Sequence, residues 1–117
     1  MEHASRILRG MKTIDTIIFL NNKRLRRMPK KADGTYLFSG VHVKGSFTVE
    51  GNELTSLEGS PEIVDGNFIC SGNNGLTSVV GGPRIVKNNF YCRGPDMKKF
   101  TEEEIRRTCM VWGHVFV

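Results

Sequence analysis

Apolar and polar positions in the middle of the chain recur with a period of about 21–22 residues. The frame begins at Val43, returns at Val64 and starts a third time at Val86. In the first two frames the shared positions are a Phe, an apolar residue, an Asn, two further apolar residues, a Gly and a Pro. They are Phe47, Val49, Asn52, Leu54, Leu57, Gly59 and Pro61, and then Phe68, Cys70, Asn73, Leu76, Val79, Gly81 and Pro83. Such a period predicts a stacked solenoid, in which each unit buries its apolar side only against neighbouring units.

The pattern predicts short parallel strands at residues 47–49, 68–70 and 90–92. Alternate residues of a strand share a face, so two ladders of side chains should point inward. The expected ladders are Phe47, Phe68 and Phe90, and beside them Val49, Cys70 and Cys92. We expect Asn52 and Asn73 to bond backbone groups of the loops that the strand ladder cannot reach.

The two ends of the chain depart from this repeat. Residues 2–11 are compatible with a short helix, and residues 18–29 read as a degenerate first repeat in which Lys23 replaces the asparagine. An insertion follows, with a turn expected at Asp33-Gly34. Near the other end, Thr101 and Glu104 form a capping box, which predicts a helix over residues 102–110 that covers the last rung. Residues 111–117 are apolar and are expected to dock as a last strand.

The offsets of Phe47, Val49, Asn52 and Leu54 match the leucine-rich repeat core, L-x-L-x-x-N-x-L. Over about residues 43–96, with a weaker echo at 18–29, the chain resembles short leucine-rich-repeat-like arrays of small bacteriophage and bacterial proteins. The resemblance implies a mainly β, parallel β-solenoid with 21–22-residue coils, and a binding role without catalytic residues. We therefore expect one domain: an irregular basic N-terminal cap and first coil (1–42), the repeats (43–96), and a C-terminal helical cap and tail (97–117).

Positive charge is concentrated at one end of the chain. The net charge is +5, but residues 1–31 carry nine Lys or Arg and two acids, whereas residues 32–117 carry eight Lys or Arg and ten acids. If Leu25 and Met28 point inward, the cations between and after them face water together. These cations are Lys23, Arg24, Arg26, Arg27, Lys30 and Lys31. They are candidates for binding an acidic protein surface or a phosphate backbone, and the alternative is a solvated end of the solenoid.

A second candidate surface is the solvent side of the strands. By alternation, Ile69 and Tyr91 should be neighbours that face outward, where an apolar pair can anchor a protein contact. The alternative is that the N-terminal helix or the insertion at residues 30–42 covers them.

Catalytic and metal chemistry find little support in the sequence. Cys70 and Cys92 are expected side by side in the interior, without nearby His or Cys at metal-ligand spacing, and Cys109 is expected on the buried face of the helix. Three cysteines favour reduced thiols in a reducing compartment. No local motif links His3, His42 or His114 to a nucleophile. We expect no enzyme activity, no cofactor and no metal.

The sequence as a whole favours a cytoplasmic, non-catalytic binding protein that is not inserted in a membrane. The resemblance adds the expectation of a phage-encoded adaptor or inhibitor that docks on a host protein or protein complex in the host cytoplasm. One alternative is a nucleic-acid-binding protein without sequence preference, which uses the same cations. Another is a structural subunit of a larger assembly, for which self-association is expected.

Overall fold

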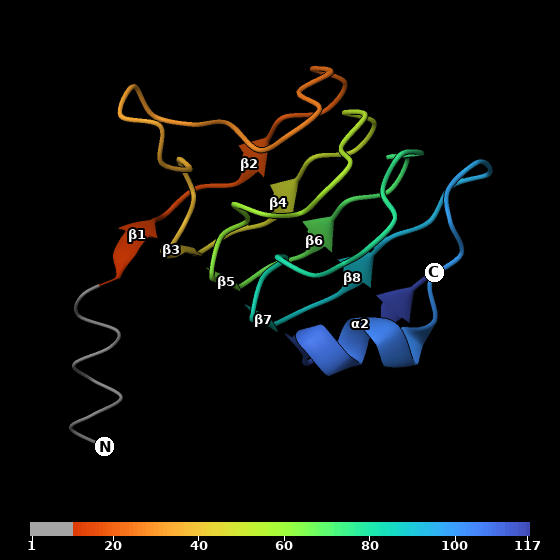
Figure 1. The fold of residues 1–117 in the computed structure, drawn as a ribbon. Helices are drawn as coiled ribbons and strands as arrows, with labels where there is room; N and C mark the ends of the chain where they lie inside the picture. The colour runs from red at the N-terminus through yellow and green to blue at the C-terminus, as the bar shows by residue number, and fades with distance from the viewer. Residues whose placement is uncertain (1–10) are drawn as a thin grey trace.

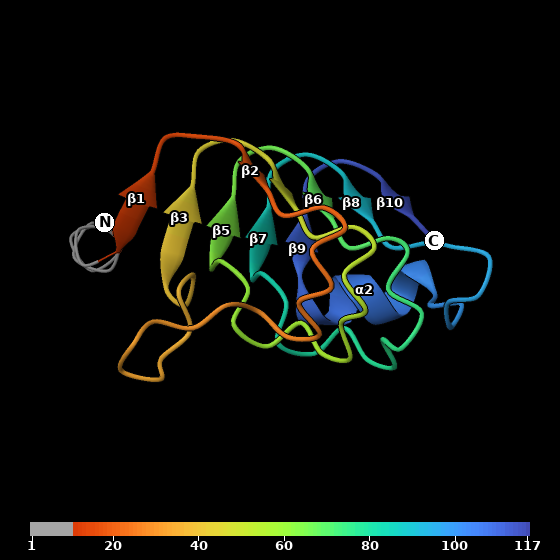
Figure 2. The ribbon, with the colours of Figure 1, turned by 90° about the horizontal axis from the view of Figure 1, so that it is seen from above.

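The computed structural model describes residues 11–117, which wind into a parallel β-solenoid. The helix predicted for residues 2–11 lies outside the described residues, except for Met11. Two parallel sheets of five strands each run along the stack, and every coil contributes one strand to each sheet (Figures 1 and 2). The stacked pairs of strands therefore form five rungs.

The strands are short and their order in each sheet follows the chain. Sheet A contains β1 (Lys12–Ile14), β3 (Val41–Val43), β5 (Ile63–Val64), β7 (Ile85–Val86) and β9 (Met110–Val111). Sheet B contains β2 (Ile18–Phe19), β4 (Phe47–Thr48), β6 (Phe68–Ile69), β8 (Phe90–Tyr91) and β10 (Val115–Phe116). The strands at 47–49, 68–70 and 90–92 are thus confirmed to within one residue, and they pair in parallel.

The core consists of the ladders that the repeat predicts. Phe47 pairs in register with Phe68, and Phe68 with Phe90, with ring centroids 5.8 and 5.1 Å apart. Val49, Cys70 and Cys92 are buried beside them, and the leucines of the repeats fill the opposite wall. Parallel stacking brings equivalent residues together, so a periodic sequence yields columns of like side chains.

Two buried asparagines connect the loops of successive coils, as expected. The side-chain oxygen of Asn73 accepts hydrogen bonds from the backbone amides of Asn52 and Leu54, at 2.9 and 3.0 Å. Its amide nitrogen donates to the carbonyls of Val49 and Cys70. Asn52 repeats the pattern one coil earlier, because its side chain accepts from the amide of Lys23 and donates to the carbonyl of Leu20.

The coils are unequal in length. Steps of 21 and 22 residues separate the middle coils, as between Ser46 and Asn67 and between Asn67 and Asn89. The first step is 29 residues, from Lys23 to Asn52, and the last is 25, from Asn89 to His114. The first coil is longer because it holds the insertion, and the last because its return segment holds a helix. A uniform coil of 21–22 residues therefore describes the middle of the stack alone.

The helix α2 (Glu102–Thr108) begins where the capping box predicts it. The Thr101 hydroxyl accepts from the Glu104 amide at 3.1 Å, which satisfies one free amide of the first turn. The helix ends at the C-cap Cys109, two residues earlier than expected, and the chain continues at once into β9. The last rung consists therefore of two strands that follow α2 in sequence, instead of the single strand expected at residues 111–117. In Figure 1, α2 lies at the end of the stack opposite β1.

Candidate functional site

The basic cluster, defined as Lys23, Arg24, Arg26, Arg27, Lys30 and Lys31, lies on the return segment of the first coil. All six residues are exposed. Between them, Met28 is buried in the core and Leu25 packs partly against it. The two apolar side chains turn inward, so the structure confirms the arrangement on which the prediction of a solvent-facing cluster depends.

The backbone of this segment is held on the second coil. The amides of Lys23 and Arg26 donate to the side-chain oxygen and the carbonyl of Asn52, at 2.7 and 2.9 Å. In return, the Arg26 carbonyl accepts from the amide of Thr55 at 3.3 Å. Lys30 forms a bridge with Tyr36 at the base of the insertion, where a turn at Asp33 closes the hairpin. The cluster is therefore carried by a backbone with defined partners rather than by a free loop.

Few of the cations have a partner within residues 11–117. Arg26 lies 3.9 Å from Glu53, in a pair so exposed that water screens it, and the Lys30 ammonium lies 4.9 Å from the centre of the Tyr36 ring. The remaining four side chains form no ion pair with the part of the chain that the structure describes. Within residues 11–117, ion pairs therefore leave most of the positive charge of the cluster unneutralised.

The cluster is also a place of backbone strain. Asn22, Arg24 and Arg26 have φ angles of 55°, 53° and 64°, in the left-handed region that disfavours side chains other than glycine. The positions that stack on Asn22 in the next two coils are Gly51 and Gly72, at φ 65° and 73°. At Asn22 the first coil therefore makes with asparagine the bend that the next two coils make with glycine. Arg24 shares its positive φ with Glu53 on the next coil, at 60°, whereas Arg26 has no positive-φ counterpart there. A left-handed arginine costs about 1–3 kcal/mol.

A second surface is the outer face of sheet B, defined as the column Phe19, Thr48, Ile69, Tyr91 and Phe116. Ile69 and Tyr91 are in register on β6 and β8, and both are partly exposed. The insertion packs elsewhere, with Tyr36 against Gly59 and the Phe38 ring edge-on to Phe47 at 5.0 Å. The N-terminal helix that was the other expected cover lies outside the described residues.

Phe19 and Phe116 extend this column, and the sequence interpretation missed both. Phe19 pairs with Thr48 on the first rung and is 62% exposed. At the other end the Tyr91 and Phe116 rings stack at 4.7 Å, with the Arg93 guanidinium 5.5 Å from the Phe116 ring. The sequence did contain the information for Phe19, because aligning Ile18 with Phe47 places Phe19 on the outer face of sheet B.

The structure does not bring all predicted site residues together. The basic cluster belongs to the first coil, whereas Ile69 and Tyr91 lie on the third and fourth rungs. Rungs are about 4.8 Å apart, so Ile69 lies roughly 10 Å along the stack from the first coil. Of the residues on the outer face of sheet B, Phe19 is the one that belongs to the same coil as the basic cluster, four residues before Lys23.

The outer face of sheet A carries a polar group that the sequence did not reveal. His42 Nε2 lies 2.8 Å from Asp65 Oδ1, and Lys87 Nζ lies 3.4 Å from the same oxygen. The Lys87 ammonium also lies 5.2 Å from the centre of the Trp112 ring. Partial burial by itself would raise the pKa of Asp65, but the hydrogen bond and charge of His42, together with Lys87, lower it below its ordinary value.

The three cysteines are free and buried in the core. Burial raises the pKa of the Cys70 thiol well above its ordinary value and that of Cys109 to about 12. Reactive cysteines have the opposite environment, with partial exposure and a lowered pKa. The thiols are therefore core side chains, as the sequence predicts.

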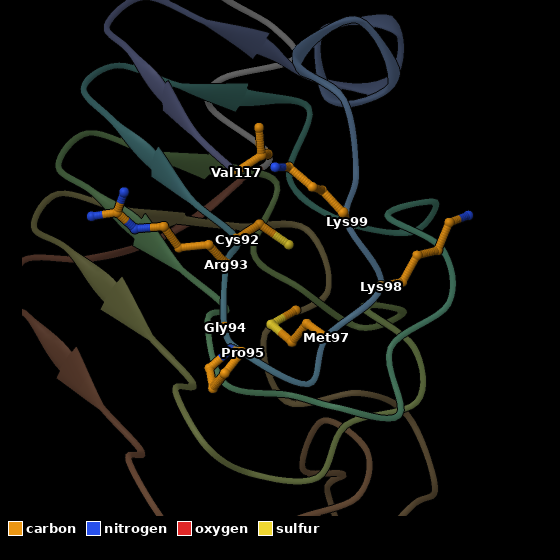
Figure 3. A pocket seen from close by; sticks show the side chains of 8 residues that line it. All are labelled: Cys92, Arg93, Gly94, Pro95, Met97, Lys98, Lys99 and Val117. Atoms are coloured by element: carbon orange, nitrogen blue, oxygen red, sulfur yellow. The ribbon is translucent and has the colours of Figure 1, made fainter.

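A cavity of about 500 Å³ opens between β8, β10 and the segment that leads to α2 (Figure 3). Cys92, Met97 and Val117 line it together with the backbone of Gly94. Figure 3 shows Lys99 reaching toward Val117, while Arg93 and Lys98 point away on opposite sides. Neither His42 nor His114 lines this cavity.

Within residues 11–117, no three His, Cys, Asp or Glu side chains lie close enough together to hold a metal ion. Over the same residues, no helix has the length and apolar character needed to cross a bilayer. Comparison with known protein families, curated proteins and solved structures found no match. The interpretation of function therefore rests on the surfaces described above.

Proposed function

We propose that this chain is a non-catalytic binding protein that docks on the acidic surface of another protein through the basic cluster. By its leucine-rich-repeat-like sequence, it would be a phage-encoded adaptor or inhibitor and its partner a host protein or protein complex. The solenoid serves as a rigid scaffold, which is the usual role of stacked repeats.

The observation that carries the proposal is the unneutralised charge of the first coil. Six exposed cations occupy one return segment, and two of its arginines are kept at strained backbone positions. Like charges at close range repel one another, and left-handed arginines cost stability. Both features destabilise the fold, so a role in binding explains the presence of these residues better than a role in stability does.

The outer face of sheet B supplies apolar side chains that can serve as anchors for a partner. Charged rims steer association and select partners, whereas affinity comes mainly from buried aromatic and aliphatic anchors. Phe19, on the first coil, is exposed enough to serve as such an anchor. Ile69 and Tyr91 form a second apolar pair on the same face, separated from Phe19 by the buried Thr48. A partner with an acidic rim around an apolar groove would match both features.

The test is affinity capture from nuclease-treated bacterial lysate with wild type and two triple variants of equal charge change. The first variant is Arg24→Glu/Arg26→Glu/Arg27→Glu in the basic cluster. The second is Arg84→Glu/Lys98→Glu/Lys99→Glu, at exposed positions of the fourth coil outside the outer face of sheet B. We expect one protein that wild type and the second variant retain and the first variant loses.

Other outcomes separate the alternatives. Nucleic acid captured only without nuclease, and released by moderate salt, would favour phosphate binding by the same cations. Identical captures by wild type and both variants would show that the basic cluster is a solvated coil end, and the proposal would be wrong.

A further inference from the structure

In sheet A, the backbone carbonyls of each rung accept hydrogen bonds from the next rung along the stack. The donors are the amides of Lys44, Asp65, Lys87 and Trp112, and the acceptors are the carbonyls of Ile14, Val43, Val64 and Val86, at 2.8 to 2.9 Å. The corner after the strand continues the pattern, because the Gly113 amide donates to the Asn88 carbonyl at 3.0 Å. Val111 and Gly113 are the equivalent acceptors of the fifth rung.

These two carbonyls are bound by one side chain. Arg106 Nη1 donates to the Val111 carbonyl at 2.7 Å, and Nη2 donates to the Gly113 carbonyl at 2.9 Å. The guanidinium therefore occupies the place that the amides of a sixth rung would take. A planar fork with two parallel N–H groups suits this task, which a single ammonium cannot perform.

The fork is held in place from its own helix. Arg106 Nε donates to Glu102 Oε2 at 2.8 Å, one turn earlier in α2. Ile105 beside it is fully buried, which fixes the helix against the last rung. Arg107 provides a contrast, since its side chain is bonded to Glu103 at 3.0 Å and makes no bond to the fifth rung.

We infer that Arg106 closes the outer edge of β9 against pairing with a second copy of this chain. An unpaired strand edge is a template for adding another strand, and one way in which natural proteins prevent this is to cover the edge with a helix or loop. A second copy is the strand donor to consider, because its strands carry the same repeat and the same parallel register. Satisfying the edge carbonyls from within removes the acceptors on which the new strand would form.

The test measures self-association by sedimentation velocity over a wide range of protein concentration. Arg106→Gln removes the fork, Arg106→Lys keeps the charge without the fork, and Arg107→Gln is the matched control on the neighbouring residue. We expect both Arg106 variants to show a mass that rises with concentration to that of a dimer or larger, above that of wild type and Arg107→Gln. Circular dichroism and thermal unfolding establish that each variant is folded.

Folded Arg106 variants with the same mass as wild type at every concentration would overturn the inference. Equal association of the Arg107 variant would also overturn it, because loss of any surface cation would then suffice. If Arg106→Gln does not fold, Arg106→Lys decides the question, since it preserves the charge and the ion pair with Glu102. This test does not involve the basic cluster, so its result is independent of the proposed function.

Discussion

At Arg24 and Arg26 the backbone is left-handed, and the next coil repeats this conformation at Glu53, the counterpart of Arg24, but not at Thr55, the counterpart of Arg26. Both residues have positive φ angles, and both carry their charge into solvent. Ion pairing does not offset the cost of this backbone strain, because the contact of Arg26 with Glu53 is long and exposed. At the residue scale, this is where stability and binding are expected to oppose one another.

Replacing Arg26 with glycine should therefore stabilise the protein while weakening its binding. Relief of the left-handed strain is expected to raise the free energy of unfolding by about 1 kcal/mol. The matched control is Arg27→Gly, which removes the same charge from a residue without positive φ and should lower stability or leave it unchanged. Urea denaturation of both variants measures the difference, and a loss of stability in Arg26→Gly would contradict the account.

Asp65 should make the fold sensitive to acid. Its pKa is lower in the folded protein than in the unfolded chain, so its contribution to stability is present above the ordinary pKa of the carboxyl. That contribution is lost as the pH falls through the lowered value. We expect Asp65→Asn to be less stable than wild type at neutral pH and to lose less stability on acidification, by urea titration at several pH values. Asp96→Asn, on the exposed loop before α2, is the control and should behave as wild type.

At the scale of the elements, much of the fold could be predicted because the offsets of the repeat define which residues of successive strands pair with one another. The offsets of Phe47, Phe68 and Phe90 placed the strands, their inward faces and the parallel pairing, all of which the structure shows. The recurrence of asparagine at the same position of two coils likewise predicted the hydrogen bonds that Asn52 and Asn73 form with the loop backbone. The expectation that Leu25 and Met28 point inward likewise predicted that the cations around them face solvent.

Features that depend on contact between unlike elements could not be predicted. His42 and Asp65 meet across adjacent coils from different positions of the repeat, because His42 aligns with Ile63 and Asp65 with Lys44. The place of α2 before the last rung depends on β9 and β10, which are too short and apolar to be separated as two strands in the sequence. The double bond of Arg106 to the last rung follows from that placement.

The asparagine ladder predicts a large difference between two neighbouring residues. Asn73→Ala would leave the buried amides of Asn52 and Leu54 without an acceptor, at a cost of about 1–3 kcal/mol for each group. Asn74→Ala changes an exposed side chain next to it and should cost little. Chemical denaturation compares the two variants, and equal stabilities would show that the ladder does not hold the coils together.

At the scale of the whole molecule, charge and core are separated along the stack. The first coil carries most of the net positive charge, whereas the middle coils carry the aromatic and cysteine ladders. Each coil packs mainly against its neighbours, so the first coil gains its stability from contact with the second. The charged coil relies on the rest of the solenoid for its fold.

The buried thiols report on the integrity of this stack. Cys70, Cys92 and Cys109 lie in the core, so a thiol reagent should modify none of them in the native protein and all three in denaturant. Burial and the raised pKa of Cys70 and Cys109 both oppose formation of the reactive thiolate. Rapid labelling of a native cysteine, measured by intact mass, would show that the core opens readily.

The most direct test of the central claim is the affinity of the captured partner for wild type and the two charge-reversal triple variants, by calorimetric titration. The account predicts that reversing Arg24, Arg26 and Arg27 weakens binding at least tenfold, about 1.4 kcal/mol. Reversing Arg84, Lys98 and Lys99, with the same change in net charge, should leave the affinity within a factor of about three, less than 1 kcal/mol. Equal weakening by both variants would contradict the claim that the first coil is the binding site.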